Sequence, residues 1–283
     1  MHENTALILE GGGMRGAFTA GVLDYWLEQG LLFRTVYGVS AGACQACSYL
    51  CGQKGRAIRI WLTYCADKRF CSFSSWLRTG DLFNVDFNYH QLPDILEPID
   101  NETYLKSGAR FYAVVTNIQT GQAEYMQVLD MKKDVGYVRA SSSLPLLSRS
   151  VKLGGGLYLD GGASDSIPLR RSMRDGNKKH VLVLTQPAGY RKEPNKVMPL
   201  IALRYRKYPD FVNTMRDRHT AYNDTLSLIE AQEKAGNVFV IRPQSPVQVG
   251  RIEHDPAKLK ALYDMGYSAA AQAYPALSAF LAE

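Results

Sequence analysis

The sequence has no long apolar run and no recognisable export signal. None of its stretches approaches the roughly 18 consecutive apolar residues that a membrane-spanning helix needs. The first residues include Glu3 and no Lys or Arg, and the first apolar stretch, Ala6–Leu9, is far shorter than the core of a secretory signal. We therefore expect a cytoplasmic protein, or one that visits the inner membrane face peripherally.

Cysteine is scarce, and its count is odd. The five cysteines are Cys44, Cys47, Cys51, Cys65 and Cys71. An odd count in a chain without an export signal argues against a disulfide framework. The first three are spaced so that they would share one helix face, a pattern that a metal or redox site also uses. No His or further Cys follows at a ligand spacing, so we interpret them as small buried residues and predict no metal.

The bulk composition is that of an ordinary folded domain. The 283 residues are 46% hydrophobic and 21% charged, which allows a core of normal size and does not indicate disorder. No internal repeat or low-complexity linker interrupts the chain, so we predict one domain over residues 1–283, with its motifs in 6–168 and a helical part in 195–283. A net charge of +6 and a pI near 9.0 favour anionic surfaces, whether phospholipid or nucleic acid; a surface charge without a functional partner is the alternative. We predict contact with an anionic membrane and none with nucleic acid.

The order of apolar stretches predicts an α/β fold with a parallel sheet. Residues 5–9 and 35–39 are predicted as short buried strands, and each precedes a glycine turn and a helical pattern, which is typical of parallel strands. Further strands are predicted at residues 110–115, 123–128, 157–159, 181–185 and 238–241, and further helices at 58–66, 200–208, 211–234 and 257–280. Residues 70–99, here called the aromatic segment, show no clear period and are predicted to leave the core as a long excursion.

The stretch GVSAG at Gly38–Gly42 is a G-x-S-x-G motif between a predicted strand and a predicted helix. In that setting a serine is held on a sharp, strained turn that exposes its Oγ. The glycines leave room for the turn, and the helix N-terminus favours developing negative charge. We predict Ser40 as a nucleophile; an ordinary glycine-rich turn is the alternative.

A second glycine loop, GGGMRG at Gly11–Gly16, opens the first predicted helix. It also satisfies the dinucleotide-binding pattern G-x-G-x-x-G, but that site needs an acidic residue at the end of the next strand, and residues 31–43 contain none. Successive glycine N–H groups beside a nucleophile can instead form an oxyanion hole. Arg15 adds a fixed positive charge that we expect to meet a phosphate or carboxylate.

A third glycine turn follows the predicted strand at residues 157–159. Asp160 stands at its end, and Gly161 and Gly162 free that side chain to point into a cleft. Asp-Gly is also the commonest turn dipeptide, so this turn alone indicates little.

A serine nucleophile needs a base within hydrogen-bond reach. His180, His219 and His254 all follow Asp160, so the chain order Ser, acid, His does not exclude a triad. Yet His180 enters a strand, His219 lies in a charged helical stretch and His254 in a polar loop. None has the setting of a catalytic histidine.

Together, the three turns resemble those of the patatin-like phospholipases. That family shows a G-G-G-x-R-G loop, a G-x-S-x-G elbow and a D-G-[GA] triplet in this order. The resemblance covers roughly Ala6 to Pro168 and includes Ala140-Ser141 and Pro145. The chain departs at Asn117, where family members often carry Asp.

The resemblance implies a three-layer α/β/α fold with a mainly parallel central sheet and a Ser-Asp dyad without histidine. Ser40 falls on the nucleophile, Asp160 on the base, and Gly11, Gly12 and Gly13 on the oxyanion hole, with Gly16, Gly38, Gly42, Gly161 and Gly162 as motif glycines. The expected reaction is hydrolysis of lipid esters, of the phospholipase A or lysophospholipase kind, through an acyl-enzyme and without metal or cofactor. A small-ester carboxylesterase with the same dyad and a lipid-binding protein with a vestigial site are the alternatives.

Two surfaces are candidates for contact with lipid. The side chains of the aromatic segment suit a lid or a membrane-facing rim. A basic run that follows Asp160 could face anionic lipid. Its members are Arg170, Arg171, Arg174, Lys178 and Lys179. The alternative is that the aromatics pack inward and that the basic run is a solvated helix face.

Overall fold

A computed structural model describes residues 4–282, so residues 1–3 and 283 of the predicted domain lie outside the described residues. The strands are β1 (Thr5–Leu9), β2 (Thr35–Val39), β3 (Arg110–Asn117), β4 (Ala123–Val128), β5 (Val151–Leu153), β6 (Gly156–Asp160), β7 (Lys179–Val183) and β8 (Val238–Ile241). The α-helices are α1 (Gly16–Glu28), α2 (Ala41–Leu50), α3 (Arg56–Tyr64), α4 (Phe73–Thr79), α5 (Asn101–Ser107), α6 (Val135–Ser141), α7 (Leu169–Arg174), α8 (Met198–Arg204), α9 (Pro209–Lys234) and α10 (Pro256–Ala282). Two short 3₁₀ turns, η1 (Gly13–Arg15) and η3 (Gly161–Ala163), and one π-helix, η2 (Phe87–Leu96), complete the set within the described residues.

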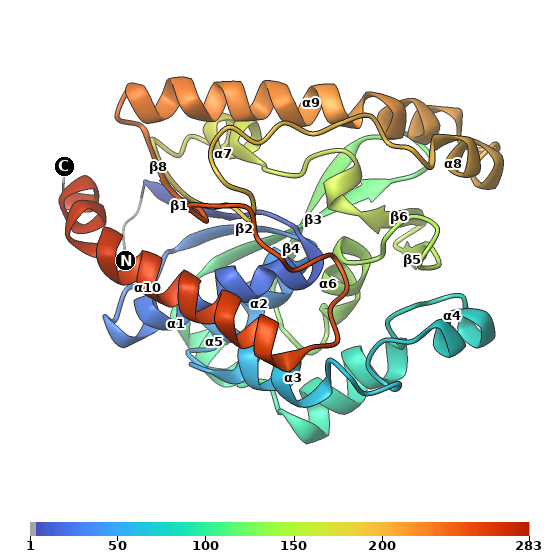
Figure 1. Cartoon of the computed structure of the whole chain (residues 1–283), viewed down its shortest axis with the longest axis horizontal. Coiled ribbons are helices and arrows are strands. Elements are labelled where there is room, and N and C mark those ends of the chain that lie inside the picture. The colour runs from blue at the N-terminus through green and yellow to red at the C-terminus, as the bar shows by residue number, and fades with distance from the viewer. Residues whose placement is uncertain (1–3, 283) are drawn as a thin grey trace.

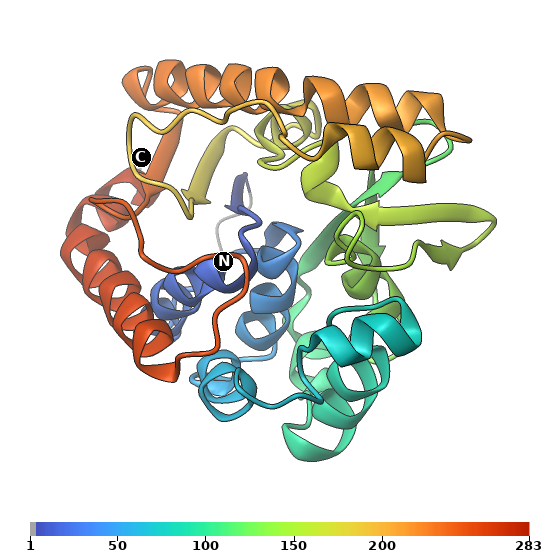
Figure 2. The same cartoon turned by 45° about the vertical axis from the view of Figure 1, so that its right-hand side comes forward.

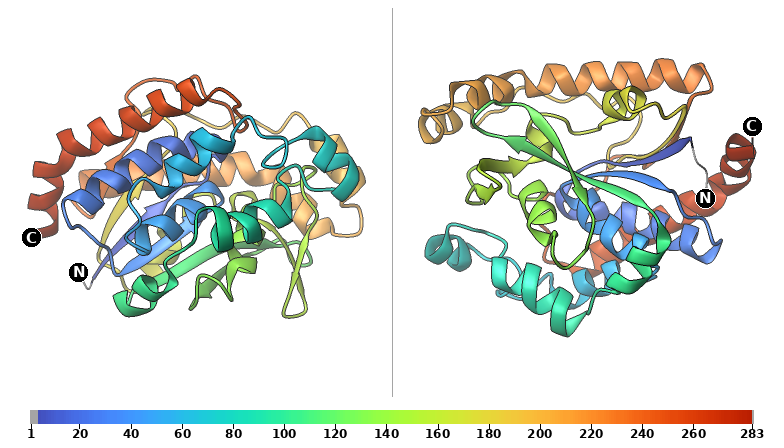
Figure 3. Two further views of the ribbon diagram at one scale, coloured as in Figure 1. Left: turned by 90° about the horizontal axis from the view of Figure 1, so that it is seen from below. Right: turned by 180° about the vertical axis from the view of Figure 1, so that it is seen from behind.

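One sheet organises the chain, with the strand order β5-β6-β3-β2-β1-β7-β8 and with β4 paired to β3. The pairs β1–β2, β1–β7, β2–β3 and β7–β8 are parallel, and the pairs of β3 with β4 and β6, and of β5 with β6, are antiparallel. The expected parallel core is therefore confirmed, and an antiparallel part is added at one end. Figure 3, right, shows the long β3–β4 hairpin in green from behind.

Helices cover both faces of this sheet, because its central strands are apolar on both sides. In β1, Leu7 and Leu9 pack into a cluster with α1, α2 and α10, whereas Ala6 and Ile8 pack toward α7 and α9. Figure 1 shows α9 above the sheet and α1, α2 and α10 below it. Figure 3, left, shows α10 lying along α1. The expected three-layer α/β/α architecture is thus confirmed.

Two strands meet end to end along β3. On one side of β3, β4 pairs from Phe111 to Thr116. On the other side, β2 runs parallel to β3 and ends with Val39 opposite Val114. β6 runs antiparallel to β3 and ends with Asp160 opposite Val115. At Val115 one side of β3 is already paired with β4, so β6 must pair with the other side, the same side that β2 pairs with. The residue that follows β2 therefore becomes a neighbour of the last residue of β6.

The aromatic segment is more regular than its sequence pattern indicated. It forms α4 and the π-helix η2, whose interior contains Pro93. The missing N–H of a proline cannot take part in the regular α-helical ladder, and a wider turn accommodates this locally. The short elements α5, α6, α7 and β5 were also not predicted, because each has too few residues for a clear period.

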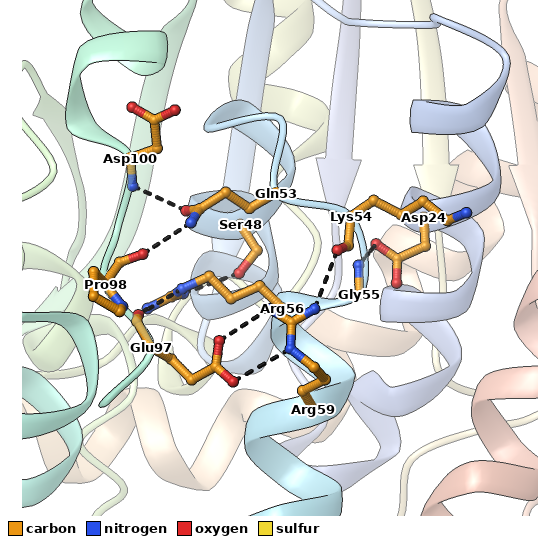
Figure 4. A network of polar contacts seen from close by, with 10 residues as sticks. All are labelled: Asp24, Ser48, Gln53, Lys54, Gly55, Arg56, Arg59, Glu97, Pro98 and Asp100. Atoms are coloured by element: carbon orange, nitrogen blue, oxygen red, sulfur yellow. Dashed lines mark hydrogen bonds and ion pairs between the residues drawn. The ribbon is translucent and has the colours of Figure 1, made fainter. Parts of the chain in front are cut away.

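The end of the aromatic segment is tied to the helical layer below the sheet (Figure 4). Arg56 is only 5% exposed, and its Nε donates to the Glu97 carbonyl oxygen at 2.8 Å. Gln53 donates to the Pro98 carbonyl oxygen at 2.8 Å and accepts from the N–H of Asp100 at 3.0 Å. These bonds hold the return of the segment against α2 and α3.

Candidate active site

Ser40 stands on a strained turn between β2 and α2. Its φ of 55° and ψ of −123° lie where residues other than glycine are rarely found. The flanking glycines allow this turn to press on the sheet: a Cβ on Gly42 would lie 2.5 Å from the Leu9 carbonyl oxygen, and one on Gly38 would strike the backbone of α2. The N–H of Ser40 donates to the Ser141 hydroxyl at 2.9 Å. The predicted elbow geometry is therefore present, and α6 helps to hold it.

Ser40 and Asp160 share a short hydrogen bond. The Ser40 hydroxyl donates to Asp160 Oδ2 at 2.6 Å, and the other carboxylate oxygen accepts from the N–H of Gly162 at 2.7 Å. Both side chains are buried. Burial raises the pKa of the Asp160 carboxyl, although the bonds from Ser40 and Gly162 and the charges of Arg218 and Arg251 act against it. A carboxylate in this position can accept the proton of the hydroxyl.

The glycine loop passes beside Ser40 with its donors unused. The hydrogen bonds of residues 4–282 engage none of the N–H groups of Gly11, Gly12 and Gly13. A Cβ on Gly11 would lie 2.9 Å from the Cβ of Ser40, and one on Gly12 would lie 2.8 Å from Thr185 Oγ1. Gly11 therefore lies directly beside Ser40, and the N–H groups of the loop are free to bind another acceptor.

A buried carboxylate, Glu10, anchors the start of this loop. One of its oxygens accepts from the N–H of Thr185 at 2.6 Å and from its hydroxyl at 3.1 Å, and the other accepts from the Tyr222 hydroxyl at 2.6 Å. The Thr185 hydroxyl also lies 3.3 Å from the Gly11 carbonyl oxygen. Glu10 therefore joins the ends of β1 and β7 to α9 at the point where the loop departs.

The histidines considered for a triad lie elsewhere. His180 is buried in β7, where Nδ1 lies 2.9 Å from a serine hydroxyl of α7, and burial lowers its pKa to about 4. His219 and His254 contact backbone carbonyls through Nδ1. No hydrogen bond in the described part of the chain joins a histidine to Ser40 or Asp160.

An apolar cavity of about 170 Å³ opens beside Ser40. It follows α2 from Ser40 past Cys44 to Cys47. The aromatic segment supplies the facing wall through Phe70, Phe83, Tyr89, Leu92 and Ile99. Burial raises the pKa of both lining cysteines, so they remain neutral thiols. Cys44 and Cys47 are half-buried where they line this cavity, whereas Cys51, Cys65 and Cys71 are buried as expected.

A second cavity of about 120 Å³ also reaches Ser40, and it is charged. Gly13, Ser40 and Leu144 line both cavities, so the nucleophile stands at their junction. The second cavity is also lined by Asp160 and Glu10 and by four cationic side chains. These are Arg15, Lys192, Arg218 and Arg251.

The tertiary structure therefore assembles most of the residues that the motifs singled out. Ser40, Asp160 and the glycine loop meet at one point, and Arg15 lines the charged cavity beside them. Asn117 instead donates to Glu124 at 2.8 Å at the β3–β4 turn. The motif analysis missed Glu10, Lys192, Arg218 and Arg251. Glu10 directly precedes a motif, and Lys192 and Arg251 lie in loops after predicted strands. Arg218 lies within a predicted helix and carries no such signal.

The basic run does not form one surface near the site. α7 carries Arg170, Arg171 and Arg174, and Arg171 pairs with Asp175 at 2.7 Å. Lys179 begins β7, which is parallel to β1, so it lies at the edge of the sheet opposite Ser40. Within residues 4–282 no group of three or more metal-ligating side chains is found, and no helix is long and apolar enough to cross a membrane.

Sequence comparisons place this architecture among known proteins. The family model described as patatin-like phospholipase matches residues 7–171, and a model described only as a domain of unknown function matches residues 208–282. The uncharacterized protein YjjU of Escherichia coli strain K12 is 32% identical over 249 residues, which are 86% of this chain and 69% of YjjU.

More distant similarities extend over nearly the whole chain. Lysophospholipase NTE1 of Debaryomyces hansenii is 25% identical over 284 aligned residues, which cover 94% of this chain but only 17% of the yeast protein. Among solved structures, VipD from Legionella pneumophila aligns with 95% of this chain and 66% of its own, at 14% identity and a TM-score of 0.47.

Proposed function

The chain belongs to the patatin-like phospholipase family, a family of lipid hydrolases, and we propose that it hydrolyses lipid acyl esters with Ser40 as nucleophile and Asp160 as base. The observation that carries this proposal is the 2.6 Å hydrogen bond between the two side chains, at the junction of an apolar and a charged cavity. Similarity to a protein named lysophospholipase supports a substrate in which one acyl chain is released from a glycerophosphoester.

In the acylation step, Ser40 Oγ attacks the ester carbonyl carbon while its proton passes to Asp160 Oδ2. The N–H of Gly162 engages the other carboxylate oxygen, which leaves Oδ2 turned toward the hydroxyl. When the tetrahedral intermediate collapses, the carbon–oxygen bond to the leaving alcohol breaks. Asp160 returns its proton to that oxygen, and an acyl-enzyme remains on Ser40.

In the deacylation step, a water molecule attacks the acyl-enzyme and gives its proton to Asp160. Collapse of the second intermediate releases the fatty acid and returns the proton to Ser40. The negative oxygen in both steps would accept hydrogen bonds from Gly11, Gly12 and Gly13, whose N–H groups are otherwise unused. One carboxylate thus serves as base and as acid in each half-reaction, and no histidine is required.

The apolar cavity is proposed to hold the acyl chain. Its walls combine α2 with the aromatic segment, so a hydrocarbon chain would leave water on entering it. About two helical turns of α2 separate Ser40 from Cys47, a rise of roughly 10 Å along which a chain could extend. This depth favours a lipid over a small ester, which is the alternative substrate class.

A fluorophosphonate probe tests the nucleophile. The probe should label the wild type, and Ser40→Ala should abolish labelling and reduce lysophospholipid hydrolysis by several orders of magnitude with the fold intact. Ser166→Ala is the matched control, because this hydroxyl lines the same charged cavity but donates to a backbone carbonyl, that of Gly162, at 2.9 Å. Labelling of folded Ser40→Ala protein would refute the proposal.

Two further readouts separate the alternatives. A chain-length series of monoacyl esters distinguishes a lipid hydrolase, whose kcat/KM should rise with chain length, from a small-ester carboxylesterase, whose kcat/KM should not. A vestigial lipid-binding protein would bind the long-chain esters without labelling or turnover.

We also propose peripheral contact with a membrane through two helices near the cavities. On α4, Phe73 and Leu77 are 65% and 67% exposed, and on α8, Leu200 and Leu203 are 57% and 66% exposed. Leu146, which lines the charged cavity, is hydrogen-bonded from both sides. Trp76 of α4 donates to the Leu146 carbonyl oxygen, and the hydroxyl of Tyr205, which follows α8, accepts from the Leu146 N–H. A bilayer that covered these side chains would lie near Leu146 and so near the wall of the charged cavity.

Liposome co-sedimentation tests this surface. The double change Phe73→Ser, Leu77→Ser should lower the bound fraction without changing hydrolysis of a dissolved short-chain ester. Leu105→Ser is the control, because Leu105 is 54% exposed on α5, which precedes the opposite end of β3. Equal binding of all three proteins would refute the contact.

A further inference from the structure

The four cations of the charged cavity come from separate parts of the chain. β1, β7 and β8 are mutually parallel through shared pairings, so their C-terminal ends lie at one edge of the sheet. Arg15 follows β1, Lys192 follows β7 and Arg251 follows β8, whereas Arg218 reaches the cavity from α9. Figure 2 shows the loop from β8 to α10, in orange-red, crossing the middle of the view before α10 begins. The C-terminal edge of parallel strands is where α/β proteins commonly bind ligands.

These cations converge without ion-pair partners. In the described part of the chain, none of the four side chains forms a salt bridge with a carboxylate. Arg218 donates through Nε to the Gly162 carbonyl oxygen, and the Nε of Arg15 is buried without a hydrogen-bond partner. Lys192 Nζ lies 4.1 Å from the centre of the Tyr222 ring. Their donors are therefore largely uncommitted.

The two carboxylates of the cavity are already engaged. Both oxygens of Glu10 accept hydrogen bonds from Thr185 and Tyr222, and both oxygens of Asp160 accept from Ser40 and Gly162. Four cations thus face two carboxylates whose oxygens already accept hydrogen bonds from other groups. Burial, followed by the charges of Arg218, Arg251 and Arg15, lowers the pKa of Lys192 to about 7, against the charge of Glu10. Four cations gathered at one cavity repel one another, and an anionic ligand bound among them would relieve this repulsion.

We propose that the cationic cavity binds the phosphate of an anionic glycerophospholipid whose scissile ester lies at Ser40. The inference rests on the proposed hydrolysis and assigns the charged cavity to the leaving group, opposite the acyl chain in the apolar cavity. Guanidinium groups suit phosphate because they donate paired hydrogen bonds to its oxygens. A head group that carries an ammonium, such as phosphocholine, would bring a further cation among the four. The cavity therefore selects a head group of net negative charge over a zwitterionic one.

Three substrates with the same acyl chain test this selectivity. They are lysophosphatidylglycerol, lysophosphatidylcholine and monoacylglycerol. The wild type should show its highest kcat/KM on lysophosphatidylglycerol. Lys192→Gln and Arg251→Gln should each lower that value about tenfold or more, the loss expected for a hydrogen bond to a charged group. Lys192→Gln should leave monoacylglycerol hydrolysis within about threefold of the wild type. Arg251→Gln is not used for that comparison, because the charge of Arg251 also lowers the pKa of Asp160.

Lys196→Gln is the matched control, because Lys196 is exposed on the same loop as Lys192 but does not line the charged cavity. It should leave all three values unchanged. Arg218 is not used as the test position, because its bond to the Gly162 carbonyl supports the turn of Asp160. Equal losses on lysophosphatidylglycerol and monoacylglycerol in Lys192→Gln, or no preference in the wild type, would overturn the inference.

Two controls separate the possible failures. Inorganic phosphate should compete with lysophosphatidylglycerol in the wild type; competition by phosphate without any preference for lysophosphatidylglycerol would show a site for free phosphate and overturn the assignment to a head group. Calorimetric binding of lysophosphatidylglycerol to Ser40→Ala protein does not depend on turnover. Binding that Lys192→Gln weakens would support the cavity assignment even if no ester were hydrolysed, whereas unchanged binding would overturn it.

Discussion

Replacing Asp160 by asparagine separates a Ser-Asp dyad from any mechanism with another base. Asp160 uses its two oxygens differently: one accepts from the N–H of Gly162 at 2.7 Å, and the other accepts from the Ser40 hydroxyl at 2.6 Å. In Asp160→Asn, the amide oxygen should take the place facing Gly162, because that backbone donor needs an acceptor. The amide NH₂ would then face Ser40 and donate to its oxygen. The hydroxyl would keep its proton and have no acceptor for it.

The expected effect is large on catalysis and small on stability. Loss of a general base costs about 10²–10⁴ in rate. The reversed hydrogen bond places this change at the upper end, about 10³–10⁴, which is roughly 4–5.5 kcal/mol in activation free energy. Stability should not fall, because burial raises the pKa of Asp160 and so disfavours the ion in the folded state. A neutral amide of the same shape avoids that cost.

Steady-state kcat/KM on a long-chain monoacyl ester measures the first effect, and the thermal midpoint measures the second. The rate of fluorophosphonate labelling should fall in parallel with kcat/KM, because both need an activated Ser40. His219→Ala is the control, since the hydrogen bonds of His219 go to Arg216 and Thr220 of its own helix and not to Ser40 or Asp160. Activity of folded Asp160→Asn within tenfold of the wild type would refute the dyad, and loss of activity in His219→Ala alone would favour a triad.

Four further outcomes are expected. Gly12→Val should lower kcat about 10²–10³-fold with little change in KM, because its side chain would collide with Thr185 and turn the loop donors away; an unchanged kcat would exclude the loop as the oxyanion hole. A pH profile of kcat/KM on monoacylglycerol should fall on the acid side at a pH above the usual pKa of an aspartate, because the base acts only when ionised and burial raises its pKa. Cys47→Phe should abolish hydrolysis of p-nitrophenyl palmitate but not of p-nitrophenyl butyrate, since the ring would fill the far part of the apolar cavity; equal losses would contradict that placement of the chain. The preference for lysophosphatidylglycerol should decline as pH rises through about 7, where Lys192 loses its charge, and Lys192→Gln should show no such decline.

Several features of this protein follow from local sequence alone. The strands of the parallel core are short apolar runs, and each of the three glycine turns imposes a backbone path on its neighbours. The elbow at Ser40 is the clearest example, because its strained φ is local to the motif, although the need for glycine at position 42 comes from contact with β1. The long helices α9 and α10 were likewise predictable, since their periods extend over many turns. The extent of the domain, residues 1–283, stays a prediction.

The meeting of the proposed catalytic groups was decided only by tertiary structure. Ser40 and Asp160 are 120 residues apart in the chain, and they become neighbours because β2 and β6 end against adjacent residues of β3. No local pattern encodes that register. The same holds for the aromatic segment, whose side chains have no helical or strand period and become a cavity wall only through packing against α2.

The charged cavity likewise combines one residue that the sequence singled out with three that only the tertiary structure brought together. Arg15 belongs to a motif and was expected to meet an anion, but Lys192, Arg218 and Arg251 carry no motif of their own. Three of the four cations converge because parallel strands end at one edge of the sheet, and the fourth because α9 packs on a face of the sheet and carries Arg218 to that edge. Short-range backbone preferences thus determined where the turns and helices begin, whereas strand register and helix packing, which depend on contacts between distant residues, determined which side chains share a site.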